Sequence, residues 1–163
     1  MAWANGDLAT AEDRFRAARA SVGPAGGQDA FEWSGPLARI MVELGRDTDA
    51  GDLLVGFRDD PTDPRPRIAA CGIGAVIAAR RGDLAEALRL SADAEAMAAA
   101  TDFLIDQGDA ALDRAEVLSL AGRTAAARAS AEEALDRFER KEYAIGIRRA
   151  RAFVDALPVH ERR

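Results

Sequence analysis

Histidine and cysteine each occur once among the 163 residues of this chain. The chain therefore has almost none of the residues that are needed for Ser–His or Cys–His catalytic pairs or for zinc sites built from Cys and His. The single cysteine, Cys71, excludes an internal disulfide and fits a reducing compartment. His160 stands in the C-terminal tail with no partner at metal-ligand spacing. We expect no enzyme, no cofactor and no metal site.

Aromatic residues are also scarce, at 6% of the chain. No segment alternates apolar and polar residues over the length of a strand, which favours an all-α fold. The longest apolar run, residues 68–79, is too short to span a bilayer, and the N-terminus lacks a secretory signal pattern. We expect a cytoplasmic protein with no membrane partner.

Excess positive charge is lacking too, because the formal net charge is −6. A negative chain is a poor match for the phosphate backbone of nucleic acids unless a local basic patch overrides it. The C-terminal arginines could form such a patch for phosphate, but the overall negative charge opposes it. We expect no nucleic-acid partner. The arginines in question are Arg137, Arg140, Arg148, Arg149 and Arg151.

Alanine is abundant, with 38 residues, and four of these alanines lie at a fixed spacing after four glycines. Each of these glycines precedes an alanine by five residues, and the glycines lie 39, 37 and 40 residues apart. A period of this length is typical of stacked helical hairpins. The pairs are Gly6 and Ala11, Gly45 and Ala50, Gly82 and Ala87, and Gly122 and Ala127.

The register has a physical explanation in the geometry of a helical hairpin. A glycine just past the end of a helix adopts the left-handed conformation at little steric cost. Asp7, Asp83 or Thr124 then caps the next helix through a side-chain oxygen. The alanine faces back across the hairpin, where a larger side chain would separate the helices. We predict helices at residues 7–21, 31–44, 48–58, 67–81, 83–100, 103–121, 124–140 and 142–156.

These helices form one domain, residues 1–157, followed by a tail at 158–163. Its units are residues 1–21, 31–58, 67–100 and 102–140, and helix 142–156 closes the array. Pro36 is expected in the first turn of the second unit, after Ser34 as a cap. Residues 22–29 are expected to form a loop. Three prolines, Pro61, Pro64 and Pro66, predict an extended connector.

The two ends of the array carry further predictions. In the last helix we expect Arg148, Arg149 and Arg151 outside, with Ile145, Ala152 and Phe153 inside. The first unit lacks most of the helix that should pair with residues 7–21, so we expect a piece of a longer array or protein. A homodimer would cover the apolar surface left there.

One stretch, "IAACGIGAVIAARRGDLAEA" at residues 68–87, allows a second interpretation, since Gly72 and Gly74 have the G-x-G spacing of a phosphate cradle. That fingerprint needs a preceding strand, a third small residue in register and an acidic residue about 20 positions on. Only the short stretch Ile68 to Cys71 precedes Gly72, directly after the proline-rich connector. The sequence therefore favours a close helix contact at Gly72, with Cys71 as a buried thiol beside it.

The segment 115–154, and Phe15 at A-x3-F spacing after Ala11, resemble the tetratricopeptide repeat. The chain is similar to the C-terminal repeat arrays of large bacterial ATPase-containing transcription regulators and cyclase-linked ATPases. The resemblance implies a right-handed α-α superhelix of about four hairpins. It further implies a regulatory module that binds a protein or peptide, or alternatively a domain that senses a small-molecule or peptide effector.

In that family the first helix of each unit lines the concave surface. Transferred to this chain, the register places at that surface the candidate partner-binding residues Glu32, Arg39, Glu43, Arg80, Asp109, Glu116 and Ser119. A related pattern comes from the spacing of carboxylates, which puts five of them on one helix face. That face is either solvated or receives a basic or amide-bearing peptide. Its members are Asp102, Asp106, Asp109, Asp113 and Glu116.

Overall fold

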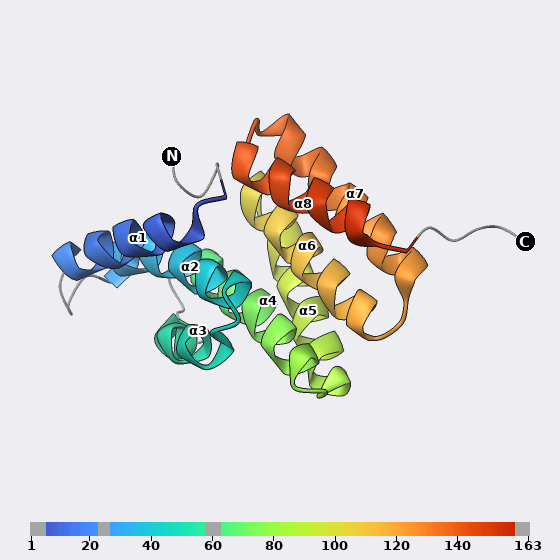
Figure 1. The fold of residues 1–163 in the computed structure, drawn as a ribbon, viewed down its shortest axis with the longest axis horizontal. Helices are drawn as coiled ribbons and strands as arrows, with labels where there is room; N and C mark the ends of the chain where they lie inside the picture. Colours follow the sequence, from blue (N-terminus) through green and yellow to red (C-terminus); the bar gives the residue numbers. More distant parts are fainter. Residues whose placement is uncertain (1–5, 23–26, 58–62, 159–163) are drawn as a thin grey trace, which may run out of the picture.

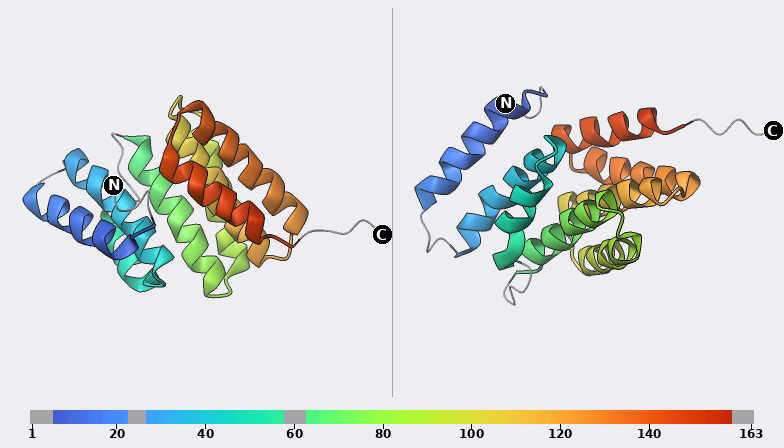
Figure 2. Two further views of the ribbon diagram at one scale, coloured as in Figure 1. Left: turned by 45° about the horizontal axis from the view of Figure 1, so that its top comes forward. Right: turned by 60° about the horizontal axis from the view of Figure 1, so that its bottom comes forward.

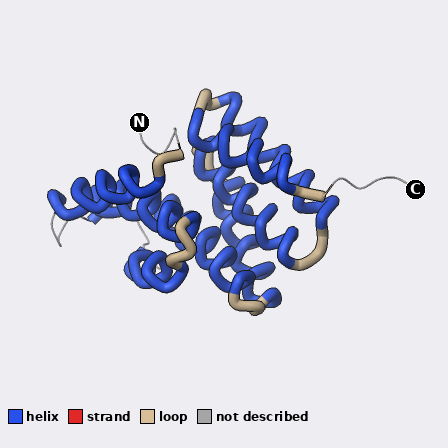
Figure 3. The backbone as a smooth tube through the Cα atoms, in the orientation of Figure 1, coloured by secondary structure: helices blue, strands red, loops and turns tan. Residues whose placement is uncertain are grey.

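The computed structural model describes residues 6–22, 27–57 and 63–158, and all regular structure in this part of the chain is helical (Figures 1 and 3). The all-α prediction is confirmed. None of the described helices is both long and apolar enough to cross a membrane. The elements are α1 (Leu8–Val22), α2 (Gly27–Glu43), α3 (Asp47–Leu54) with a 3-10 turn at Val55–Phe57, α4 (Pro64–Arg80), α5 (Leu84–Ala99), α6 (Leu104–Leu120), α7 (Thr124–Arg140) and α8 (Ala144–Ala156).

Consecutive helices pack as hairpins, and every second helix joins a continuous row. The hairpins are α2 with α3, α4 with α5, and α6 with α7, while α1 packs on α2 and α8 on α7. In addition α4 contacts α2 and α6, and α6 contacts α8. The row α2–α4–α6–α8 therefore forms one layer of the molecule, and its order can be followed in Figures 1 and 2.

The turns between helices have the conformation that the glycine register predicts. Gly6, Gly45, Gly82 and Gly122 all have positive φ, between 73° and 87°. At Gly82 the next amide, of Asp83, donates to the carbonyl of Ala78 at 3.0 Å, which ties the helix end to the turn. The four register alanines, Ala11, Ala50, Ala87 and Ala127, are buried.

A fifth turn of the same type lies between α7 and α8, where the sequence has no glycine. Glu142 has φ 56°, and the following amide, of Tyr143, donates to the carbonyl of Phe138 at 2.9 Å. A non-glycine residue in this conformation costs about 1 kcal/mol or more. The packing of α8 therefore imposes a turn that Glu142 does not favour.

Two of the three predicted helix caps are confirmed. Asp7 Oδ1 accepts from the amide of Thr10 at 3.1 Å, and Asp83 Oδ1 accepts from the amide of Glu86 at 3.2 Å. The prediction for Thr124 is wrong. Thr124 is already the first residue of α7, because the cap position directly follows the turn glycine and is filled by Arg123.

The proline-rich connector is shorter than predicted. Helix α4 begins at Pro64 and includes Pro66, with Asp63 as its cap accepting from the amide of Arg65 at 2.9 Å. Both prolines lie in the first turn, where a helix has no internal acceptor for its amides and loses nothing when they are absent. Pro61 lies outside the described residues.

Helix α2 also differs from the prediction, because it begins at Gly27 rather than near residue 31. Pro36 therefore lies inside the helix, where it removes one backbone hydrogen bond, and not in the first turn. Ser34 is buried and does not cap the helix, since its hydroxyl accepts from Arg19 Nε at 3.0 Å. Residues 27–29 of the predicted loop belong to α2, and residues 23–26 lie outside the described residues.

The last helix turns a different face inward than expected. Arg148 and Arg149 are both half-buried, and Arg149 reaches carboxylates on α2 and α6. Ala152 is exposed, so its predicted inward position is wrong, while Phe153 is half-buried and Arg151 exposed as predicted. Charge attraction to Glu43 and Asp109, which helical periodicity cannot predict, explains the inward position of Arg149.

Close packing of α6, α7 and α8 depends on two glycines that flank one ring. Phe138 of α7 is fully buried. A β-carbon added at Gly108 of α6, or at Gly146 of α8, would lie 2.5 Å from that ring. Both helices therefore approach Phe138 to a distance that only glycine allows.

We expect Gly108→Ala and Gly146→Ala each to destabilise the chain by about 1–3 kcal/mol, because the ring is enclosed and overpacked atoms must shift. Urea denaturation followed by circular dichroism measures this. Gly51→Ala is the matched control. Gly51 lies in α3 with its nearest neighbour 3.9 Å from an added β-carbon, so the control should be neutral or up to about 1 kcal/mol stabilising. Equal losses in all three variants would contradict the packing explanation.

Candidate functional site

The row of helices α2, α4, α6 and α8 encloses a solvent-connected space that we call the hollow. It consists of two adjoining cavities, one of about 350 Å³ and one of about 40 Å³. Both are lined by Glu43, Asp113, Glu116 and Arg149, so they share a wall. The larger cavity adds Leu112, Arg148, Ala152 and Phe153, and the smaller adds Arg39, Val42, Ile73, Val76 and Arg80.

Arg39 lies at the base of the hollow, where it lines the smaller cavity, and its guanidinium crosses from α2 to α6. Its Nη1 donates to Asp113 Oδ1 at 2.6 Å, and its Nε lies 3.4 Å from Asp109 Oδ2. The side chain is 8% exposed, so this is a buried ion pair. Burial alone would lower the pKa of Arg39, but the two carboxylates outweigh it and raise the pKa.

Arg149 extends this pair into a closed ring. From α8 its Nη1 donates to Asp109 Oδ1 at 2.7 Å, and its Nε lies 3.1 Å from Glu43 Oε1. Glu43 belongs to α2, the helix that carries Arg39. The five residues Arg39, Asp113, Asp109, Arg149 and Glu43 thus connect α2, α6 and α8, and we call them the ion-pair ring.

Arg80 makes the corresponding connection from α4. Its guanidinium contacts Glu116 Oε1 on α6 at 2.6 Å, Asp47 Oδ1 on α3 at 3.1 Å and the carbonyl of Val42 at 2.8 Å. Glu116 and Arg80 are each about one third exposed. This pair therefore lies at the accessible rim of the hollow, whereas Arg39 and Asp113 lie at its base.

Gly72 has a structural role at this base. It lies inside α4, one turn before Val76, and a β-carbon added to it would be 2.3 Å from Asp113 Oδ2. That oxygen is buried and has no hydrogen-bond partner among the described residues. Burial raises the pKa of Asp113, while Arg39 opposes the rise. The glycine that resembled a phosphate cradle instead makes room for a carboxylate.

Asp106, one turn before Asp109 on α6, has a carboxyl whose pKa is strongly raised. Burial raises its pKa to about 6, and the negative charge of Asp109 adds to the effect. Arg39 and Arg65 act in the opposite direction. The acid-rich face of α6 is therefore crowded with negative charge even with the arginines in place.

Of the five carboxylates predicted to share one face of a helix, Asp106, Asp109, Asp113 and Glu116 lie on α6, and most of that face is not solvated. Asp109, Asp113 and Glu116 point toward arginines of α2, α4 and α8. Asp102 is exposed and precedes α6. The C-terminal arginines are also paired with acids, as in Arg137 with Glu133, Arg140 with Asp136, Arg149 with Asp109, and Arg151 with Glu139.

The structure gathers part of the predicted partner-binding set at the hollow. Arg39, Glu43, Arg80 and Glu116 line it. Asp109 belongs to the ion-pair ring, where it contacts both Arg39 and Arg149. Glu32 is exposed on α2 and Ser119 half-buried on α6, and neither lines the two cavities. Partner binding by any of these residues stays a prediction.

Three charged lining residues are missing from the predicted partner-binding set: Asp113, Arg148 and Arg149. Asp113 had a usable signal, because it follows Asp109 by four residues and so shares its helix face. The two arginines had none, since an arginine held inside by distant carboxylates has the same local sequence as a solvated one. Cys71, predicted to be a buried thiol, is half-buried on α4, and His160 lies outside the described residues.

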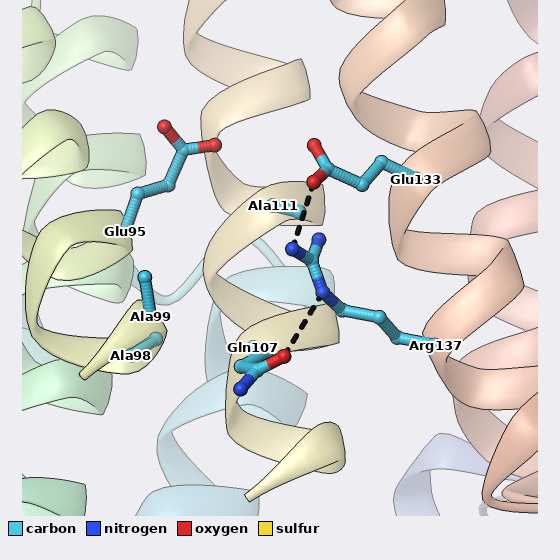
Figure 4. Close-up of a pocket in the computed structure, with 7 residues that line it drawn as sticks. All are labelled: Glu95, Ala98, Ala99, Gln107, Ala111, Glu133 and Arg137. Atoms are coloured by element: carbon cyan, nitrogen blue, oxygen red, sulfur yellow. Dashed lines mark hydrogen bonds and ion pairs between the residues drawn. The ribbon is translucent and has the colours of Figure 1, made fainter. Parts of the chain in front are cut away.

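A further cavity, of about 180 Å³ and lined by none of the residues of the hollow, lies between α5, α6 and α7 (Figure 4). Alanines form part of its wall, and Glu95 and Glu133 face each other across it. Arg137 contacts Glu133 at 2.7 Å and Gln107 at 3.2 Å, while Glu95 contacts Arg114 at 3.1 Å. Each of these five polar side chains therefore has a partner, and packing between alanine-rich helices explains the cluster.

Among the described residues, no group of three or more His, Cys, Asp or Glu side chains is arranged to hold a metal ion. Comparisons with models of known protein families, with curated proteins and with solved structures find no match to this chain. The function of the hollow is therefore inferred from the residues that line it.

We expect Gly72→Ala to destabilise the chain by about 2–4 kcal/mol, because the new methyl group displaces Asp113 and breaks its bond to Arg39. A double-mutant cycle with Asp113→Ala, measured by urea denaturation, tests the cause. The cost of Gly72→Ala should fall sharply when Asp113 is already absent. The same cost in both backgrounds would show that another contact is responsible.

We also expect a pH-dependent effect of Asp106→Asn. Because the pKa of Asp106 is about 6 in the folded chain and 3.8 ordinarily, its ionisation opposes folding as pH rises through that window. The variant should be up to about 3 kcal/mol more stable than the wild type at pH 7, at about 1.4 kcal/mol per pKa unit, and no more stable at pH 4. Urea denaturation at both pH values measures this. Asp136→Asn, an exposed carboxyl on α7, is the control; a pH-independent gain in Asp106→Asn would refute the assignment.

Proposed function

We propose that this chain is a tetratricopeptide-like solenoid that acts as a non-catalytic interaction or regulatory module and binds a protein or peptide in the hollow. Two features support the repeat arrangement. The positive-φ glycine turns recur at 39, 37 and 40 residues, and the helices after those turns alternate with the row α2–α4–α6–α8. A right-handed superhelix is the arrangement that such hairpins build.

One observation carries the choice of binding surface. Side chains from four helices meet at a single hollow, whose lining combines charged groups with the apolar side chains of Leu112, Ala152 and Phe153. A concave surface with an apolar wall and a few charged groups suits recognition of a peptide segment or a helix. The acids there are engaged with arginines, which favours binding over acid–base catalysis.

The wider setting belongs to the same proposal. A module of this kind would belong to a larger bacterial regulator in the cytoplasm. Binding of a partner in the hollow would then control the activity of an attached domain. Self-association through α1 stays a prediction. The exposed large apolar side chains of the described chain, Leu44, Val55, Phe103 and Leu120, lie outside that helix.

A second candidate is a domain that senses a small-molecule effector, and one observation favours it. The ion-pair ring bridges α2, α6 and α8 and so narrows the hollow, whose larger cavity of about 350 Å³ is in the size range of small-ligand sites. A co-purifying small molecule released on denaturation, with no protein partner, would select this candidate.

We expect partner capture from native lysate to fall at least about tenfold in Arg80→Gln/Glu116→Gln, because both rim charges are removed. Mass spectrometry of the recovered proteins measures this. The matched control is Arg89→Gln/Glu86→Gln, which removes a surface pair of the same chemistry, 2.7 Å apart on α5.

The charge-exchanged variant Arg80→Glu/Glu116→Arg separates binding from stability. It restores an ion pair between α4 and α6 while reversing the charges that a partner meets. Loss of capture in this variant, with unchanged thermal stability, supports recognition by the rim. Full capture by both hollow variants would remove the hollow as the binding surface.

A further inference from the structure

The beginning of α8 lies against the beginning of α1, although the two segments are far apart in the sequence (Figure 1). Ile145, in the first turn of α8, packs against the buried pair of Ala11 on α1 and Ile40 on α2. A β-carbon built at Gly6, in the turn before α1, would lie 3.3 Å from Arg148 Nη1 of α8. The first two turns of α8 therefore form part of the seat on which α1 rests.

The same turns of α8 also line the hollow. Arg148 and Arg149 border the larger cavity, together with Ala152 and Phe153 one turn further along the helix. Arg149 is bound to carboxylates of α2 and α6, which fixes it at the wall. Arg148 instead reaches the turn before α1, so one side chain borders both the hollow and the seat of α1.

Helix α1 is held by few buried groups. Between Leu8 and Ser21, Ala11 alone is buried. The helix packs on α2, where Phe15 contacts Trp33 with the ring centroids 6.2 Å apart. An element with so little buried surface opens at a lower free energy than the core of the same protein. Loss of the contacts with α8 would therefore shift α1 measurably toward an undocked state.

The position of Arg148 makes docking of α1 and occupation of the hollow interdependent. While α1 is docked, the guanidinium of Arg148 lies against the backbone of Gly6. When α1 leaves, that contact is lost and the guanidinium is able to turn toward the cavity. A ligand that contacts Arg148 there binds the undocked state more tightly, and by linkage it shifts the population toward that state.

We propose that α1 is a displaceable helix, and that occupation of the hollow releases it through the first two turns of α8. The inference rests on the proposed function, because it gives the proposed binding surface a conformational effect at the first helix. Release uncovers the apolar seat formed by Ile40 and Ile145.

The test measures hydrogen–deuterium exchange of the α1 amides in the intact chain by mass spectrometry, with a cavity-filling side chain in place of a ligand. Ala152 is exposed and lines the larger cavity, so Ala152→Trp brings an indole to the cavity and the chain should still fold. The α1 amides should exchange at least about fivefold faster than in the wild type, while those of α5 stay unchanged.

Ala156→Trp is the matched control for this variant. Ala156 is exposed one turn further along α8 and lines neither cavity of the hollow. The control should leave the exchange of α1 at the wild-type rate. Unchanged or slower exchange of α1 in Ala152→Trp, or equal acceleration in both variants, would overturn the proposal.

Arg148→Ala tests the connecting side chain. Removal of the guanidinium should itself speed α1 exchange at least about threefold, and Ala152→Trp should then add little, because both changes act through one contact. Arg151→Ala, which removes an exposed arginine of α8 paired with Glu139 at 2.7 Å, should have no effect on α1. Wild-type exchange in Arg148→Ala, or fully additive effects in the double variant, would exclude coupling through Arg148.

The proposed function and the release of α1 fail separately. A partner whose capture is blocked by Ala152→Trp, together with unchanged α1 exchange, leaves the interaction module and removes the release of α1. Faster α1 exchange in Ala152→Trp, together with partner capture that no change in the hollow affects, leaves the coupling and removes the hollow as the binding surface.

Discussion

The buried guanidinium of Arg39 is the constraint on which the arrangement of the helices depends. It binds Asp113 and Asp109 of α6, and Asp109 in turn binds Arg149 of α8, which returns to Glu43 of α2. Charges of this kind are costly to bury, and each is tolerated only because the others are placed to meet it. The ring therefore specifies how three helices lie relative to one another more strongly than it adds to stability.

Small residues surround this ring for a reason that follows from it. Gly72 lets α4 approach the carboxylate of Asp113, and the same principle recurs where Gly108 and Gly146 admit the ring of Phe138. Elsewhere fully buried alanines such as Ala115 and Ala134 keep neighbouring helices close. The low aromatic content and high alanine content of the chain are thus two aspects of one close-packed, helix-on-helix design whose polar interior needs charge pairing.

That polar interior is also what makes the hollow chemically selective. A groove lined by unpaired charges would attract any opposite charge, whereas here Arg80 pairs with Glu116 and Arg149 with Glu43. The accessible rim and the buried base differ in role. Arg80 and Glu116 are accessible to a ligand, while the buried pair of Arg39 and Asp113 holds α2 and α6 together.

The sequence by itself determined the local features of this protein: its helices to within a few residues, the glycine turns and the aspartate caps at Asp7 and Asp83, because these depend on residues at most a few positions apart. It also placed Arg39, Glu43, Arg80 and Glu116 on the helices that meet at the hollow. Tertiary structure alone decided that Arg39 pairs with Asp113, 74 residues away, that Arg149 turns inward, and that Glu142 adopts a glycine-like turn. Those outcomes depend on which distant charges and surfaces meet, and helical periodicity contains no information about the partner across the interface.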